Sequence, residues 1–285
     1  MTFSIVGFDP SSGDLGVVVA SKFPAVGVVV PWAKAGVGAV ATQAWARTSY
    51  GPEGLTLMEG SSGSAPVALE RLVEADDGRE HRQVGMVDAA GRAATFTGAS
   101  CMDWAGGRSG DGFAAQGNIL VGPEVVDAMC RGYESAAGDL VDRLLAALAA
   151  GDRAGGDRRG RQSAALLVVR ESGGYEGYTD RYVDLRVDDH PDAPSELARV
   201  FEAYDRDILI RNDAQLEAGP DLVADLQRRL TRLGRFAGEA DGTYDDATRD
   251  AIAGFAGEYN LEGRLRDDDR ISETLVREIR DVTPD

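Results

Sequence analysis

The sequence has little cysteine and no long apolar segment, and each shortage excludes a class of protein. Cys101 and Cys130 are the only cysteines, which argues against a disulfide scaffold and fits a reducing cytoplasm. The longest apolar run, residues 23–33, includes two prolines and is shorter than the roughly 20 residues of a membrane-spanning helix. No basic segment leads into an apolar core at the start, so we expect no signal peptide and a cytoplasmic protein.

Lysine is nearly absent, and acidic residues dominate the charge. Lys22 and Lys34 are the only lysines among 30 basic residues, which face 48 aspartates and glutamates and leave a net charge of −18. Such a charge disfavours nucleic acids and anionic membrane surfaces as partners. Because salt screens the repulsion between carboxylates, this acidic and lysine-poor composition predicts a protein from a salt-rich cytoplasm.

Short strand patterns alternate with helix patterns over the first 195 residues. Ser64 precedes the helical repeat "APVALERLVEA", and two more helices are expected over residues 123–151 with a break near Gly138. Strands are expected at residues 2–9, 15–21, 25–30, 37–43, 83–87, 93–97, 162–169 and 182–187. Runs of adjacent strands divided by helix pairs favour antiparallel sheets covered by helices.

The composition changes after "DDHPDAP" at residues 188–194. A helical pattern follows, and from residue 216 onward the sequence indicates short helices only. We therefore expect a large domain at 1–195, a helical linker at 196–215 and a small helical module at 216–285.

Several stretches of the large domain resemble domain-of-unknown-function family 1028 (DUF1028). They include "GDLGVVVASKF", "SYGPEGL", "TGASCMDWAGG", "QGNIL" and "DLRVDDHP", in this order along the domain. The family is placed among the N-terminal-nucleophile hydrolases, so the resemblance implies an α+β fold built as a four-layer αββα sandwich. It suggests a mechanism and leaves the substrate open.

The tail resembles a peptidoglycan-binding module. The stretches "LQRRLTRLG" and "DGTYDDATRDAIAGF" carry the resemblance, although Ala256 stands where the module's pattern has glutamine. The resemblance implies a small all-α unit of three helices. Because no secretion signal is recognised, we expect a role in interaction or dimerisation and regard peptidoglycan as a doubtful partner.

Thr2 is the first catalytic candidate. The resemblance places the nucleophile at the first residue of the processed chain, and removal of Met1 would expose Thr2 with a free α-amine. With an ordinary pKa of about 7.7–8.0, that amine can take the hydroxyl proton near neutral pH. The alternative is that Thr2 is only a β-branched strand residue.

Lys22 and Asn118 are the other catalytic candidates. Lys22 follows the second expected strand, where in the superfamily's hairpin it would lie near the first residue and could lower the amine pKa or stabilise an oxyanion. Asn118, in "AAQGNIL", could donate to the same oxyanion. The alternatives are a solvated cation at Lys22 and a turn that requires Gly117.

Other side chains are candidates for substrate binding. Gln43 and Tyr50 belong to a polar and aromatic stretch after an apolar strand, which suits a pocket or an ordinary half-exposed strand end. Arg158 and Arg161 lie in a Gly/Arg loop that could hold a small anion or pair with local aspartates. The loop lacks the "GK[ST]" signature of nucleotide phosphate sites. His190, which follows the last expected strand, completes this set.

Cys101 is a weaker candidate nucleophile. Only His81 and His190 could serve as its base, and a free cysteine is usually a small buried residue. No cluster has the spacing of a zinc site or an EF-hand, so we expect neither metal nor cofactor.

The leading hypothesis is amide hydrolysis of a small anionic molecule by Thr2. The alternative is a non-catalytic ligand-binding or assembly protein that keeps the fold without N-terminal processing. The Gly-rich apolar segment "VPWAKAGVGAVATQAWA" also predicts a homo-oligomer, because it offers more apolar surface than one domain is expected to bury.

Overall fold

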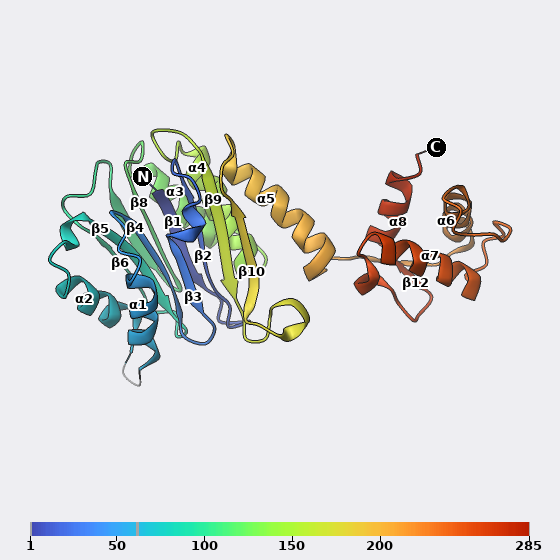
Figure 1. The fold of residues 1–285 in the computed structure, drawn as a ribbon, viewed down its shortest axis with the longest axis horizontal. Helices are drawn as coiled ribbons and strands as arrows, with labels where there is room; N and C mark the ends of the chain where they lie inside the picture. Colours follow the sequence, from blue (N-terminus) through green and yellow to red (C-terminus); the bar gives the residue numbers. More distant parts are fainter. Residues whose placement is uncertain (1, 61–62, 285) are drawn as a thin grey trace. The chain divides into compact units, whose positions relative to one another are not determined.

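The chain folds into two compact units (Figure 1). The computed structural model describes residues 2–60 and 63–284. The first unit extends to Val200 and the second begins at Phe201. Helix α5 (Ala193–Tyr204) crosses this boundary, and the separate linker at 196–215 stays a prediction.

In its described part, the first unit contains two antiparallel sheets with the strand orders β10-β9-β2-β1-β8-β7 and β3-β4-β5-β6. The larger sheet consists of β1 (Thr2–Phe8), β2 (Leu15–Ser21), β7 (Gly106–Gly110), β8 (Phe113–Asn118), β9 (Ser163–Val169) and β10 (Arg181–Val187). The smaller sheet consists of β3 (Pro31–Lys34), β4 (Gly38–Ala44), β5 (Arg82–Asp88) and β6 (Ala93–Thr97). The strand that begins at Thr2 is therefore internal, with a paired strand on each side.

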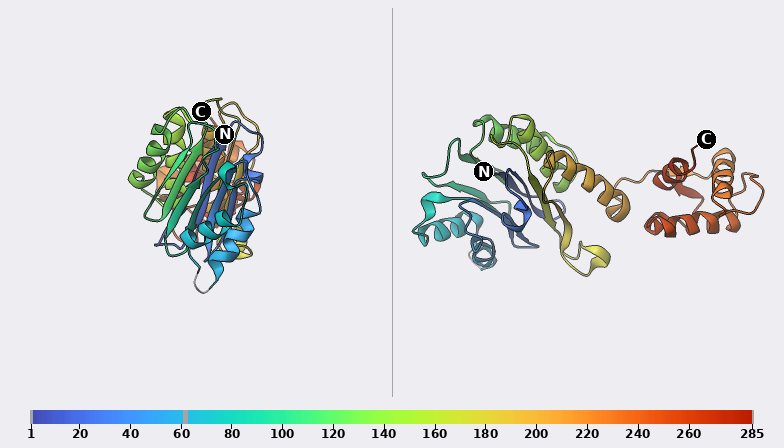
Figure 2. Two further views of the ribbon diagram at one scale, coloured as in Figure 1. Left: turned by 90° about the vertical axis from the view of Figure 1, so that its left-hand side faces the viewer. Right: turned by 45° about the horizontal axis from the view of Figure 1, so that its top comes forward.

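The two sheets pack against each other, and helices lie on their outer faces (Figure 2, left). Valines of β1 and β2 meet alanine and valine side chains of β4 and β5 in the apolar layer between the sheets. Helices α1 (Tyr50–Glu59) and α2 (Ala65–Glu74) pack on the smaller sheet. Helices α3 (Glu124–Ser135) and α4 (Leu140–Arg153) pack on the larger one, where the absence of a side chain at Gly7 leaves room for a tyrosine of α3.

Local signals explain where several helices begin. The Ser64 hydroxyl accepts the Val67 N–H at 3.4 Å and caps α2. The expected break between α3 and α4 falls at Gly138, whose φ of +101° favours glycine. Asp139 then starts α4 in a reciprocal capping box with Asp142.

Some elements differ from the sequence expectation. Residues 25–30 do not form a strand: Ala25 has a φ of +50°, a short 3-10 turn follows, and the strand comes later as β3. The sequence carries no signal for α1, which contains Gly51, Pro52 and Gly54. Gly117 lies inside β8 and makes no turn, so the alternative of a turn there is wrong.

Among the described residues of the second unit, three α-helices and a short two-stranded sheet follow α5. The helices are α6 (Pro220–Arg232), α7 (Asp246–Glu258) and α8 (Glu273–Asp281), and they share one apolar core. Strand β11 (Gln215–Glu217) pairs with β12 (Arg270–Ser272), so the expectation of an all-α module is wrong. Strands of three residues are too short to leave an alternating pattern in the sequence. Among the described residues, no helix combines the length and apolar character needed to cross a bilayer.

The motif residues of this module form a hydrogen-bond network around the buried side chain of Gln227. Gln227 donates from Nε2 to the Thr243 carbonyl at 3.1 Å and to Thr248 Oγ1 at 3.0 Å. Its Oε1 accepts the Gly242 N–H at 2.9 Å, and Gly242 has a φ of +79°. The glutamine, glycine and threonine of the motif therefore fix the turn between α6 and α7.

Candidate functional site

Several strand ends meet where β1 begins. Thr2 pairs with Asn118, the last residue of β8, and its hydroxyl oxygen lies 3.1 Å from Ser21 Oγ at the end of β2. From the smaller sheet, Gln43 Nε2 donates to the Thr2 carbonyl at 3.2 Å. Antiparallel pairing places the start of one strand beside the ends of its neighbours, so residues distant in sequence share one edge here.

Gln83, at the start of β5, joins polar groups of both sheets. Its Oε1 accepts from Gln43 Nε2 and from Asn118 Nδ2, both at 2.8 Å. Its Nε2 donates to the Gly117 carbonyl at 2.8 Å and to Thr97 Oγ1 at 2.9 Å. The three amide side chains are at most 2% exposed, so these hydrogen bonds hold them in fixed orientations in a medium of low dielectric constant.

Ser4 and Gln116 extend this network into the layer between the sheets. Gln116 Nε2 donates to Ser4 Oγ, which donates to Gln43 Oε1, both at 2.7 Å. Gln116 Oε1 is buried and has no hydrogen-bond partner among the described residues. Gly85 of the facing sheet makes room for it, since a Cβ there would collide with that oxygen. Because buried amides cost free energy unless they are fully bonded, a polar interior at this end indicates a function beyond packing.

Lys22 lies beside the strand ends near Thr2, but its side chain is hydrogen-bonded to Arg161. Its Nζ donates to the Arg161 carbonyl at 3.2 Å, and its backbone N–H donates to Asp157 Oδ2 at 2.8 Å. Among the described residues no hydrogen bond joins Lys22 Nζ to Thr2. The lysine therefore ties the end of β2 to the Gly/Arg loop.

The Gly/Arg loop runs across the same strand ends. The Arg158 N–H donates to the carbonyl of Ile119, the residue after β8, at 3.2 Å. The Arg161 guanidinium is paired with Asp152 at 2.7 Å. The Arg158 side chain is exposed and has no ion pair or hydrogen bond in the part of the chain that the structure describes. Of the two candidate arginines, Arg158 is thus the one without a carboxylate partner there.

Tyr50 and His190 do not join the network around Thr2. Tyr50 begins α1 and is buried on the outer face of the smaller sheet, where its hydroxyl donates to Asp76 Oδ2 at 2.9 Å. His190 Nδ1 accepts the Asp192 N–H at 3.1 Å, just before α5. Both side chains hold local structure, and their roles in substrate binding stay predictions.

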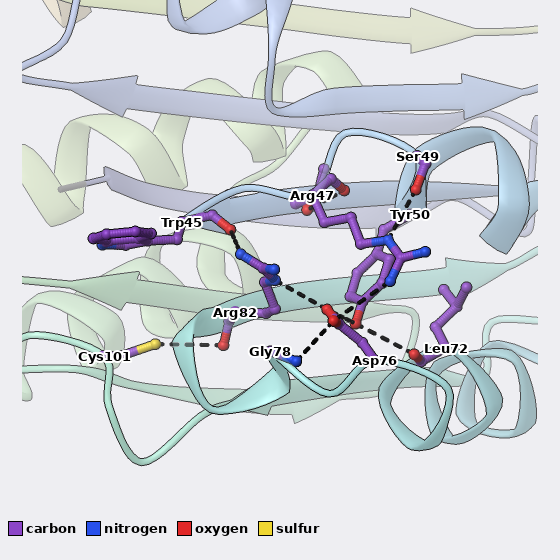
Figure 3. Close-up of polar contacts among 10 residues, drawn as sticks. Trp45, Arg47, Ser49, Tyr50, Leu72, Asp76, Gly78, Arg82 and Cys101 are labelled. Carbon is purple, nitrogen blue, oxygen red and sulfur yellow. Dashed lines mark hydrogen bonds and ion pairs between the residues drawn. The ribbon is translucent and has the colours of Figure 1, made fainter.

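Polar groups around the buried carboxylate of Asp76 link α1 and α2 to β5 (Figure 3). Asp76 Oδ2 accepts from Arg82 Nε and the Tyr50 hydroxyl, and Oδ1 accepts the Gly78 N–H, each at 2.9 Å. Arg47 Nη1 lies 3.4 Å from Oδ1. Burial by itself would raise the pKa of Asp76, but these hydrogen bonds outweigh burial and lower the pKa to about 2. Burial and the bond to Asp76 raise the pKa of Tyr50.

A cavity of about 460 Å³ opens beside the start of β1. Phe3, Ser21, Asp157 and Arg161 are among its lining residues, and Thr2 is not. Because successive strand residues face opposite sides of a sheet, Phe3 points to the helix-covered face while Thr2 points to the layer between the sheets. The cavity therefore approaches Thr2 from the other face of the larger sheet.

Cys101 has the environment of a structural thiol. Its Sγ donates to the Arg82 carbonyl at 3.3 Å (Figure 3), and burial raises its pKa. Neither histidine is bonded to it among the described residues. Within residues 2–60 and 63–284, no group of three or more His, Cys, Asp or Glu side chains could hold a metal ion.

Comparison with known families places both units. A family model described as a family of unknown function, DUF1028, matches residues 2–197. The chain belongs to the DUF1028 family. A second model, the peptidoglycan binding domain PG_binding_2, matches residues 209–278, which lie within the second unit.

A solved DUF1028 protein shares this architecture. The crystal structure of a protein from Silicibacter pomeroyi matches with a TM-score of 0.66 and 32% sequence identity, over 72% of this chain and 86% of that one. A protein named Lon protease from Frankia alni is 33% identical over 136 residues, which are 45% of this chain and 15% of that protein. The matched segment is therefore a minor part of the Frankia protein.

Proposed function

We propose that the DUF1028 unit is an amide hydrolase of the N-terminal-nucleophile type, with Thr2 as its nucleophile. The position of Thr2 carries the proposal: it starts an internal strand at the end where polar side chains of both sheets converge. The two packed sheets with helices outside support the αββα assignment that the DUF1028 resemblance implies.

The proposed reaction needs a free α-amine on Thr2. Cleavage of the peptide bond before Thr2 supplies it, and the amine then accepts the hydroxyl proton as Oγ1 attacks the amide carbonyl. The leaving amine takes that proton as the C–N bond breaks, and water hydrolyses the acyl ester to restore Thr2. Ser21 Oγ orients the Thr2 hydroxyl from 3.1 Å. Met1 itself lies outside the described residues.

Asn118 supplies the oxyanion donor in this proposal. Its Nδ2 carries two N–H groups, and the bond to Gln83 Oε1 uses one of them. Backbone pairing keeps Asn118 beside Thr2, so the second N–H is available where negative charge develops on the carbonyl oxygen. Gln43 holds the Thr2 backbone, and Lys22 and Arg158 supply the positive charge that favours a small anionic substrate.

The test begins at the chain terminus. Intact mass and N-terminal sequencing of the protein purified from its own host should give Thr2 as the first residue. Thr2→Ala should then abolish hydrolysis of carboxylate-bearing amides, whereas Thr56→Ala, on the exposed face of α1, should leave it unchanged. Retention of the residue before Thr2, or full activity of Thr2→Ala, refutes the proposal.

One observation favours the alternative of a non-catalytic ligand-binding protein. Thr2 is only 6% exposed, and Gln43, Lys22 and Asn118 already have hydrogen-bond partners. A protein that keeps these bonds without processing would hold a ligand over the strand ends and leave it unchanged. Unprocessed chains that co-purify with a bound metabolite would support this alternative.

For the second unit we propose a glycan partner. The PG_binding_2 match supports it, as does a cavity of about 460 Å³ that Tyr244, Arg249 and Arg270 help to line. The Arg249 guanidinium lies over the Tyr244 ring at 4.0 Å. In a pull-down with insoluble peptidoglycan, the unmodified full chain should bind and the Arg249→Gln variant should stay in solution. The control variant Arg277→Gln, which changes an exposed residue of α8, should bind like the unmodified chain. Failure to retain the unmodified chain would end this proposal.

A further inference from the structure

Two cations without carboxylate partners lie at the Thr2 end of the first unit, where β1 begins and β2 and β8 end. Arg158 has no side-chain hydrogen bond or ion pair among the described residues, and Lys22 Nζ bonds only to a backbone carbonyl. The neighbouring arginines differ: Arg159 is paired with Asp157, and Arg161 with Asp152.

Backbone contacts bring Lys22 and Arg158 to the same strand ends. The Lys22 N–H donates to Asp157 Oδ2 at 2.8 Å, and Arg158 is the next residue after Asp157. The Arg158 N–H in turn donates to the Ile119 carbonyl at 3.2 Å. The Asp157 carboxylate is buried and occupied by the Lys22 N–H and the Arg159 side chain, so it does not neutralise the two cations.

The unpaired charges of the surrounding loops are of both signs. Lys22, Arg153 and Arg158 have no ion pair among the described residues, and neither do Asp103, Glu124, Asp188 and Asp189. Three cations against four carboxylates leave this end close to neutral, whereas the chain as a whole carries −18. An anion is therefore repelled less here than over most of the surface, and the Arg158 guanidinium offers it a charged donor.

Exposed apolar side chains stand around the cations. Phe23 after β2, Val121 after β8 and Met102 in the loop after β6 are 50%, 47% and 60% exposed. The Met102 carbonyl accepts the Ile119 N–H at 2.9 Å, so its loop adjoins the strand ends that carry Arg158. Large apolar side chains that gather on separate loops around one site indicate that something covers them.

We infer that this end binds an amphiphilic anion, a molecule with a carboxylate and an alkyl or aromatic group. Arg158 and Lys22 bind the carboxylate, and Phe23, Met102 and Val121 contact the apolar group. The inference rests on the proposed function, for which it names the substrate class: an N-acyl amino acid, whose amide bond lies between an apolar chain and a carboxylate.

Octanoate tests the binding apart from catalysis, because it has both features and no amide bond. Calorimetric titration of the full chain should give a Kd for octanoate about tenfold or more below those of acetate, which lacks the chain, and octanamide, which lacks the charge. Arg158→Gln should weaken octanoate binding about fivefold or more. Arg131→Gln is the matched control and should have no effect, because Arg131 is an exposed arginine of α3 with no ion pair among the described residues. Phe23→Ser should weaken octanoate binding and leave acetate binding unchanged.

The outcomes separate this inference from the proposed function. Octanoate binding no tighter than that of acetate or octanamide overturns the inference, and so does an Arg158→Gln variant that keeps its melting temperature and its full affinity. Octanoate binding by a chain that hydrolyses no amide supports the inference and counts against Thr2 as a nucleophile.

Discussion

Replacement of Asp76 by asparagine should destabilise the first unit strongly at neutral pH and weakly in acid. Its carboxylate accepts from Arg82, Gly78 and Tyr50, and its pKa is about 2 against an ordinary value of 3.8. A pKa that is lower in the folded than in the unfolded state means that the ionised carboxylate stabilises the fold above pH 3.8. That stabilisation is lost as the pH falls from 3.8 through about 2.

The size of the destabilisation follows from the pKa shift of Asp76 and from the Arg82 guanidinium that would lose its carboxylate partner. A shift of about two pKa units corresponds to about 2.5 kcal/mol. Because Arg47 and Arg82 are 39% and 21% exposed, solvent screening reduces the expected value to about 1–2 kcal/mol. Leaving the Arg82 guanidinium without its carboxylate adds about 1 kcal/mol, so we expect a total of about 2–3 kcal/mol at pH 7.

Urea unfolding followed by tryptophan fluorescence measures this difference, because Trp32, Trp45 and Trp104 all belong to the first unit. The free-energy gap between the unmodified protein and Asp76→Asn should narrow by about 0.5–1 kcal/mol near pH 3, because about half of the contribution of the ionised carboxylate is lost there. Asp77→Asn is the control, since Asp77 is exposed and has no ion pair among the described residues. A gap that stays constant from pH 7 to pH 3 would refute the argument that the charge of Asp76 stabilises the fold.

Three further predictions concern the two networks and the charge. Gln83→Ala should reduce amide hydrolysis about tenfold or more, because Gln43 and Asn118 lose their shared acceptor; a lower melting temperature with unchanged kinetics would make Gln83 purely structural. Gln227→Ala should destabilise the second unit by about 2 kcal/mol in urea followed by circular dichroism, while the tryptophan transition of the first unit stays in place. The melting temperature should rise steeply from about 0.01 M to 1 M KCl, because the Debye length falls from roughly 30 Å to roughly 3 Å; a flat profile would contradict the salt-rich origin.

Elements with strong local signals could be predicted from the sequence. Strands β1 and β2 and helix α2 follow from their apolar patterns, the "DPSSGD" turn and the Ser64 cap. Helix α1 could not be predicted, because its two glycines oppose a helix, its proline in the first turn is neutral, and packing on the smaller sheet stabilises it. Strand β7, with the sequence "GGRSG", is likewise fixed by pairing with β8 rather than by propensity.

The candidate site could be predicted only in part. Thr2 and Asn118 follow from the family resemblance, but their direct pairing depends on strand register, which the sequence does not specify. Gln83 was missed because a single polar residue near the start of an apolar strand is usually half exposed. The signal that could have found it is the amide-rich set of Gln43, Gln83 and Gln116 on strands that are otherwise apolar and buried.

Folding explains the motif residues of the second unit but does not explain the buried amide side chains of the first unit. In the second unit, the motif residue Gln227 is hydrogen-bonded to Gly242 and Thr248 and so fixes the turn between α6 and α7. Folding alone therefore accounts for the presence of these three residues. In the first unit, folding alone does not account for the buried amides around Thr2, because apolar side chains would fill the same layer without a hydrogen-bonding requirement. Gln116 Oε1, buried without a partner among the described residues, adds a cost that packing does not explain. The observations therefore favour chemistry or ligand binding at the Thr2 end more strongly than they favour a retained ligand site in the second unit.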